Sequence, residues 1–183
     1  MFDSLTDVEL FQLTTDSFNH YNARCPRCGA TGKLSPYGNY SRWLVFLDDN
    51  ASYQRVMPHR FKCSSCGATH ALLPDIITPY SPYSLRFKLS ALIAYFRRDM
   101  SVVAVCEHYG IAVSTIYAWE ALFRSHMKLM LGVLAASKEP ALAFLRSLFC
   151  SAGISERLRG FYDRHGFSFM QNRSTTATRP RPP

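Results

Sequence analysis

Apolar residues recur at helical spacing in the rear half of the chain. Between residues 84 and 98 the apolar stripe consists of Leu85, Leu89, Leu92, Ile93 and Phe96. A repeat of three to four residues is typical of an amphipathic helix with one buried face. Ser84 stands immediately before the stripe and has the side chain of an N-cap. The pattern predicts a helix after Ser84, and Ser101 is the expected cap of the next helix.

Residues 102–123 have the pattern of a helix-turn-helix. The first helix of such a motif needs a small residue, the turn needs a residue that tolerates a positive φ four positions later, and the second helix needs an apolar residue six positions beyond. Cys106, Gly110 and Ile116 stand at these positions. The remaining buried positions would be Val102, Val105, Tyr109, Ile111 and Trp119. An ordinary helical hairpin, in which the glycine is only a C-cap, is the alternative.

The second helix of this motif is expected to begin near Val113 or Ser114. Its predicted DNA-facing residues are Val113, Ser114, Thr115, Tyr117 and Ala118, with Arg124 near its end. N-terminal residues of such a helix reach base edges in the major groove. None of the first five can make a bidentate contact with a base, so we expect modest sequence specificity. Arg124, His126 and Lys128 are expected to face phosphates or solvent.

The front half of the chain has the period of two that is typical of β-strands. Residues 53–62 alternate between two sets of side chains, and residues 37–46 are rich in aromatic and β-branched types. Asp48-Asp49-Asn50 marks a turn between these segments. Pro58 cannot donate to a strand ladder, so we expect it at an edge or a bulge. The pattern predicts an extended hairpin that leads to Cys63.

Two pairs of cysteines flank this hairpin. They form a first knuckle, Cys25-Pro26-Arg27-Cys28-Gly29, and a second knuckle, Cys63-Ser64-Ser65-Cys66-Gly67. A gap of two residues lets both thiols of a pair face one point, and the glycine tolerates the positive φ of such a turn. Facing knuckles form a tetrahedral zinc site, so the predicted ligands are Cys25, Cys28, Cys63 and Cys66. Two disulfides or four free thiols are the alternative. A gap of two residues would make a cramped disulfide ring, and nothing in the sequence indicates an oxidising compartment.

Three further side chains near these patterns carry metal-binding chemistry. His70 follows the second knuckle, but four cysteines already complete a tetrahedral shell, so a packing or hydrogen-bonding role is expected. Cys106 and Cys150 stand in apolar surroundings and are interpreted as small buried hydrophobic residues.

Prolines at positions 74, 79 and 82 separate the two patterned halves. The predicted fold class is α+β, with an N-terminal zinc ribbon of β-hairpins followed by an all-α helix-turn-helix domain with extra C-terminal helices. The predicted segments are 1–22 (N-terminal segment), 23–74 (zinc ribbon), 75–83 (linker), 84–128 (helix-turn-helix), 129–170 (C-terminal helices) and 171–183 (disordered basic tail). A cap at Ser4 or Thr6 would start a short first helix. Tyr80 and Tyr83 lie within the linker and are expected to pin it by packing, and residues 166–170 are expected to cap the core.

The composition favours a polyanionic partner. The formal net charge is +8, and from residue 124 onward ten basic residues face three acidic ones. Such an excess is most often associated with nucleic acid. No basic-then-apolar leader opens the chain, and no apolar run approaches the ~18–20 residues of a membrane span. We therefore expect a cytoplasmic protein without membrane contact, and nothing indicates its oligomeric state.

Four segments resemble a bacterial family of uncharacterised proteins that pair a zinc ribbon with a transposase-like helix-turn-helix. They are Cys-Pro-Arg-Cys-Gly-Ala (25–30), Tyr-Gly-Asn-Tyr-Ser-Arg-Trp (37–43), Arg-Phe-Lys-Cys-Ser-Ser-Cys-Gly-Ala-Thr-His-Ala-Leu-Leu-Pro (60–74) and Pro-Tyr-Ser (79–81). The layout is similar to the DNA-recognition front end of insertion-sequence transposases. The resemblance implies zinc on the four knuckle cysteines and double-stranded DNA as the partner.

Three functions remain open at this point. A DNA-binding accessory or regulatory factor of a transposon is favoured. A protein-interaction module that recruits a transposase or a transcription component is the alternative. A nuclease or complete transposase needs two or three carboxylates that hold paired metal ions, whereas the acids beyond the knuckles fall mostly in predicted helices. The chain is therefore expected not to be an enzyme.

Overall fold

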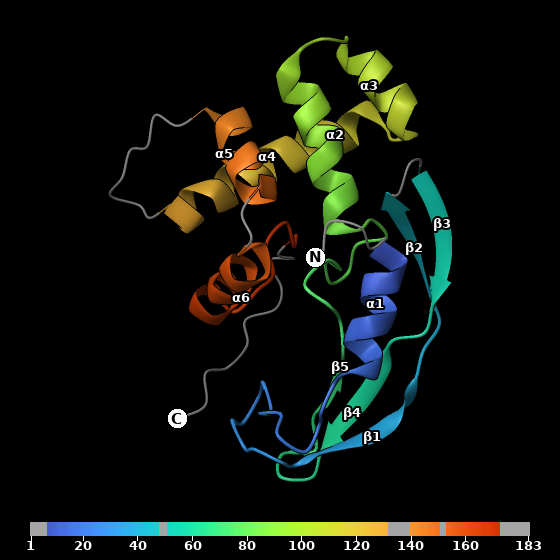
Figure 1. The fold of residues 1–183 in the computed structure, drawn as a ribbon, viewed down its shortest axis with the longest axis vertical. Helices are drawn as coiled ribbons and strands as arrows, with labels where there is room; N and C mark the ends of the chain where they lie inside the picture. Colours follow the sequence, from blue (N-terminus) through green and yellow to red (C-terminus); the bar gives the residue numbers. More distant parts are fainter. Residues whose placement is uncertain (1–6, 48–50, 132–139, 151–152, 173–183) are drawn as a thin grey trace. The chain divides into compact units, whose positions relative to one another are not determined.

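The computed structural model describes residues 7–47, 51–131, 140–150 and 153–172 of the chain. These residues form an α+β protein of two compact units (Figure 1). The first unit comprises the described residues up to Ile76, and the second runs from Ile77 to Asn172. The predicted α+β class is confirmed. The division between the units falls within the proline-containing segment 75–83.

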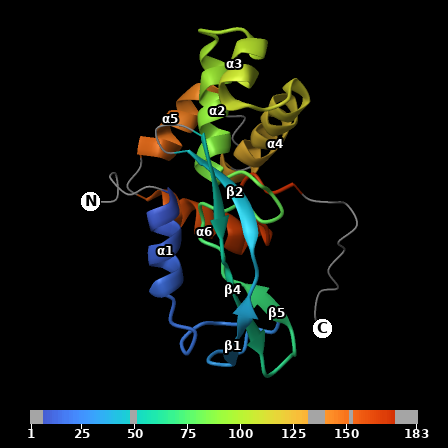
Figure 2. The same ribbon diagram turned by 90° about the vertical axis from the view of Figure 1, so that its right-hand side faces the viewer.

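Within the described residues, the first unit contains a helix and a long β-hairpin. Its elements are α1 (Asp7–Asp16), β1 (Leu34–Asn39), β2 (Arg42–Leu47), β3 (Ala51–Val56), β4 (His59–Cys63) and β5 (Thr69–Ala71). β1, β4 and β5 form one antiparallel sheet, and β2 pairs with β3 in a second. The Tyr40 N–H donates to the Pro58 carbonyl at 3.3 Å between the sheets, so they are successive stretches of one hairpin. Its two arms run side by side in both views (Figures 1 and 2).

Local chemistry explains how the hairpin is divided. Pro58 lies between β3 and β4, outside both strands, as expected for a residue without a backbone donor. β2 buries Leu44, Val45 and Phe46 in succession, and α1 packs against this strand. Phe11 of α1 is also buried. The first unit therefore has an apolar layer at the β2–β3 sheet, in addition to the small core at the cysteine-containing end.

The second unit is helical in the part that the structure describes. Its helices are α2 (Leu85–Arg97), α3 (Val102–Tyr109), α4 (Val113–Leu131), α5 (Ala141–Cys150) and α6 (Ile154–His165). Both predicted caps form: the Ser84 hydroxyl accepts the Phe87 N–H, and the Ser101 hydroxyl accepts the Ala104 N–H, each at 3.2 Å. α2 contacts α3, α4 and α5, so its apolar stripe is the centre of this unit.

The two tyrosines of the linker segment have different environments. The Tyr83 ring stacks on Phe87 with centroids 5.3 Å apart and meets the Trp119 ring edge-on at 5.0 Å. Tyr80 is 92% exposed, so the expectation that it packs is wrong. Its φ of 60° turns the chain there. Of these two tyrosines, Tyr83 therefore packs on the helical core and Tyr80 does not.

The end of the described chain is held by two buried polar side chains. The Met170 N–H donates to His126 Nδ1 at 2.9 Å, and Lys88 Nζ donates to the Met170 carbonyl at 3.2 Å. Phe167, Phe169 and Met170 are buried, as expected of a core cap. His126 is 3% exposed, so its expected position facing phosphates or solvent is wrong. Its hydrogen bond to a segment far along the chain offsets the cost of burying it.

Some predictions fall outside the described residues. They concern the cap at Ser4 or Thr6, the turn Asp48-Asp49-Asn50, the tail from Arg173 onward and the side chain of Cys150. Among the described residues, no single helix has both the length and the mean hydropathy to cross a membrane. In this part of the chain, α3 and α4 meet that test only when taken together, as a pair bent by 99°.

Candidate functional site

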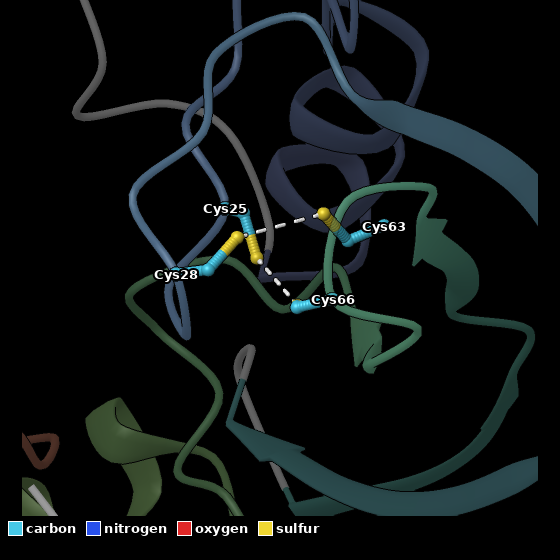
Figure 3. A group of neighbouring side chains, drawn as sticks. All are labelled: Cys25, Cys28, Cys63 and Cys66. Carbon is cyan, nitrogen blue, oxygen red and sulfur yellow. Dashed lines mark hydrogen bonds between the residues drawn. The ribbon is translucent and has the colours of Figure 1, made fainter. Parts of the chain in front are cut away.

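Four cysteine side chains converge in the first unit. One sulfur atom from each of Cys25, Cys28, Cys63 and Cys66 lies within 4.8 Å of the other three. Figure 3 shows the first knuckle facing the second, with 3.8 Å from Cys25 Sγ to Cys66 Sγ and from Cys28 Sγ to Cys63 Sγ. A disulfide needs a separation of about 2.05 Å, and all four thiols are free. The cluster could therefore hold one metal ion, as the spacing predicts.

The two knuckles have the same backbone hydrogen bonds. In the first, the Cys25 N–H donates to the Ala30 carbonyl and the Gly29 N–H donates to the Cys25 carbonyl, both at 2.9 Å. In the second, the corresponding donors and acceptors link Cys63 to Ala68 and Gly67, also at 2.9 Å. Gly29 and Gly67 have φ values of 76° and 70°. These are conformations that side chains with a Cβ rarely adopt, which explains a glycine after each pair.

Backbone amides and neighbouring thiols tune the acidity of the cluster. The Ala30 N–H lowers the pKa of Cys28 to about 6 against the opposing effect of burial. The Ala68 N–H also lowers the pKa of Cys66, but burial and hydrogen bonds with the other three thiols prevail and raise it to about 11. One thiol thus ionises more easily than usual, whereas burial and the hydrogen bonds with the other thiols hold a second one protonated. A cation at the centre would favour the thiolate form of all four.

His70 lies beside the cluster. Its Nε2 is 3.3 Å from Cys25 Sγ, and β5 holds it opposite Phe61 of β4. A ring N–H directed at a thiolate stabilises the charged sulfur and fixes its orientation. His70 is therefore an outer partner of the cysteines, which agrees with the hydrogen-bonding role expected from the sequence.

A small apolar core supports the knuckles. Leu34 and Phe61 are packed with Cys25 and Cys63, and all four are buried. The Phe18 ring lies 5.1 Å from the Phe61 ring. Leu34 is the strand partner of Cys63, so β1 and β4 bring core and sulfur atoms to the same end of the sheet. Few residues stabilise this end apart from the cysteines.

The predicted DNA-facing residues lie along α4 in the second unit. Val113, Ser114, Tyr117, Ala118 and Arg124 are exposed, and Thr115 is half-buried. Arg124 forms an ion pair with Glu120, and its guanidinium carbon lies 5.3 Å from the centre of the Phe96 ring. The exposed surface of α4 therefore begins with small, uncharged and aromatic side chains, and Arg124 is already partly paired.

One protein-family model matches the chain. It is described as Domain of unknown function (DUF6431) and matches residues 25–119, just over half of the chain. The chain belongs to the DUF6431 family. The DUF6431 region begins at Cys25 and ends at Trp119, so it includes the four knuckle cysteines, α2, α3 and the start of α4. No curated protein and no solved structure matches the chain.

The DUF6431 region also contains a cluster that was not among the predicted site residues. Arg60 and Lys62 of β4 and Tyr37 of β1 lie together, with both cations 5.5 Å from the centre of the Tyr37 ring. The strand alternation places Arg60 and Lys62 on the other face of β4 from Phe61 and Cys63, so the sequence alone could have indicated that the two cations share a face. Tyr37 joins them at a register shift between Pro36 and Gly38 that the sequence does not reveal.

Proposed function

We propose that this protein binds duplex DNA through the N-terminal half of α4, with α3 and α4 acting as a helix-turn-helix. The observation that carries the proposal is the 99° bend between α3 and α4, followed by an exposed start of α4. A short helix that crosses a longer one leaves the N-terminus of the second free to enter the major groove.

Details of the turn support this interpretation. Gly110 has a φ of 62° and ends α3 in the left-handed conformation that a tight turn needs. The Ile111 N–H donates to the Cys106 carbonyl at 2.9 Å, which closes the turn. Cys106 and Ile116 are buried, at 4% and 0% exposure. Small and apolar residues thus stand where the two helices of such a motif dock on each other.

We infer that the metal is zinc. A tetrahedral ion bound ~2.3 Å from each sulfur separates the sulfurs by about 3.8 Å, which matches the two closest sulfur pairs. Cys25, Cys28, Cys63 and Cys66 would hold it. Four thiolates leave no open coordination position, which is typical of structural zinc rather than of a catalytic ion. Zinc would stabilise the small core around Leu34 and Phe61.

The biological role that fits is a transposon-related accessory or regulatory factor. The layout of a zinc ribbon followed by a helix-turn-helix, which is similar to that of transposase front ends, supports this role. The net charge of +8 favours DNA as the partner, and affinity would fall as salt rises. The role requires no catalytic residue in this chain.

Selection of bound sequences from random duplex DNA tests the proposal, with metal content measured on the same preparation. We expect enrichment of a short site, modest discrimination, and about one zinc ion per chain. A preparation that is folded and metal-loaded but shows neither enrichment nor a salt-dependent shift of duplex DNA would refute DNA binding.

An exposed aromatic pair favours a second function, protein recruitment. Trp43 of β2 and Tyr53 of β3 are 62% and 70% exposed, and Arg55 lies opposite Trp43. Exposed Trp, Tyr and Arg are enriched in protein interfaces. A transposase or transcription partner is the expected occupant. Its association should persist after nuclease treatment and be lost in Trp43→Ala, whereas DNA-bridged association should disappear with the nucleic acid.

A further inference from the structure

The three-stranded sheet of the first unit has one face directed away from its core. On β4, Phe61 and Cys63 are buried, whereas Lys62 is exposed and Arg60 half-buried on the alternate positions. Tyr37 of β1 is 53% exposed. The Arg60 guanidinium carbon and Lys62 Nζ each lie 5.5 Å from its ring centre. We call Tyr37, Arg60 and Lys62 the basic sheet face.

Among the described residues, no carboxylate is paired with this face. Residues 17–47 and 51–74 contain both knuckles and all five strands, and no Asp or Glu occurs among them, against seven Arg and Lys residues. Within the described part of the chain, neither Arg60 nor Lys62 forms an ion pair with a carboxylate. Arg60 Nη2 donates only a long hydrogen bond, 3.4 Å, to the Thr69 hydroxyl.

The charge of the metal cluster does not account for these cations. Four thiolates and one divalent ion leave a charge of −2, which two of the seven basic residues would offset. Arg60 and Lys62 also stand on the opposite side of β4 from Cys63. Their ring contacts with Tyr37 hold two like charges close together, so a bound anion would relieve their repulsion.

We propose that the basic sheet face binds the phosphate backbone of DNA. Alternate residues on a strand are about 6.7 Å apart. That distance is close to twice the ~3.4 Å rise per phosphate along one DNA strand, so the two cations can contact one strand together. The inference rests on the proposed DNA-binding function and adds a sequence-independent contact from the first unit. Because Cys63 ends the same strand, metal binding fixes the backbone that presents the two cations.

The test compares the salt dependence of DNA affinity between variants and the wild-type protein, all full-length and zinc-loaded. Removing two phosphate contacts in Arg60→Gln/Lys62→Gln should reduce the slope of log affinity against log salt by about 1.8, and affinity at low salt by roughly tenfold or more, for selected and unrelated duplexes alike. Tyr37→Leu should weaken binding severalfold with little change in slope. The matched control is Arg157→Gln/Arg159→Gln on α6, which removes the same charge from exposed positions.

The outcomes separate this inference from the proposed function. Two results would overturn phosphate binding by the basic sheet face while leaving α4 as the reader. One is an equal slope in the sheet-face variant and the wild-type protein, and the other is an equal loss of slope in the sheet-face and α6 variants. The wild-type protein could instead bind single-stranded DNA but no duplex, with a smaller salt-dependence slope in the sheet-face variant. That result would support phosphate binding by the basic sheet face and refute the role of α4. Zinc content and melting temperature identify a misfolded variant, in which case the single variant Lys62→Gln should still reduce the slope by about 0.9.

Discussion

His70 is the residue at which metal affinity can be separated from the fold. Its ring nitrogen lies 3.3 Å from Cys25 Sγ, yet the four cysteines could supply all four positions of a tetrahedral ion. His70→Ala should weaken metal binding by roughly tenfold or more, because outer partners typically contribute that much by stabilising the ligand charge. Competition with a chromophoric chelator measures the change. His59→Ala, at an exposed position of β4, is the matched control, and equal affinities in the two variants would contradict the role of His70.

Single residues also mark the limit of sequence interpretation. The four cysteines were predictable because each pair and its glycine form a local turn whose geometry depends on five residues. Lys88 and His126 were not, since both bury their polar atoms against the Met170 backbone, far along the chain. A charged or titratable side chain in a helix is ordinarily assigned to solvent unless its distant partner is known.

The turn between α3 and α4 in the second unit depends on Gly110, which ends α3. Gly110 has a φ of 62° and free space around the position of a Cβ. Gly110→Ala should lower the free energy of unfolding by about 1 kcal/mol, because the left-handed conformation costs ~1–2 kcal/mol in residues with a Cβ. Denaturant unfolding measures the change.

Gly160 provides the opposite control. It lies within α6, where a Cβ would also meet nothing within 4 Å and no positive φ is present. Gly160→Ala should therefore raise the free energy of unfolding by roughly 0.5–1 kcal/mol. If both substitutions change stability in the same direction, the conformation of Gly110 is not what stabilises the turn.

The first turns of α4 can be tested as a surface without disturbing the helix. Ser114 and Tyr117 are exposed, so Ser114→Ala/Tyr117→Ala should leave the melting temperature nearly unchanged. Affinity for the selected DNA should fall roughly tenfold or more, because contacts to base edges are lost. Ser125→Ala/Tyr162→Ala removes the same groups from exposed positions elsewhere. Unaltered affinity of the Ser114/Tyr117 variant would show that α4 is not the reader.

At the element scale the sequence was informative wherever a pattern repeats locally. The alternation of residues 53–62 predicted an extended hairpin with Pro58 at an edge or a bulge, and the apolar stripe after Ser84 predicted α2. The bulge at Pro36 and Gly38 escaped prediction, because it depends on the pairing of β1 with β4 rather than on residues in either strand. The basic sheet face became visible only with that pairing.

For the whole molecule, the two units differ in what stabilises them. The cysteine end of the first unit has a core of four buried residues, two of them Cys25 and Cys63. The second unit has a larger core, in which Phe87, Leu92, Ile116 and Phe123 are fully buried. A small module generally depends on its metal, since structural zinc contributes ~10–16 kcal/mol to folding. Metal removal should therefore act on one unit and spare the other.

Chelation of the full-length protein tests this division. An excess of a strong chelator should abolish the strand signals of β1, β4 and β5 while the helical circular dichroism at 222 nm and its melting transition remain, because α2–α6 belong to the second unit. Cys63→Ser should reproduce the chelated state. Cys106→Ser should not release metal, since burial raises the pKa of the Cys106 thiol and keeps it protonated within the helical unit. Loss of helical signal on chelation, in a single transition with the strands, would contradict independent stabilisation, because the metal would then support both cores.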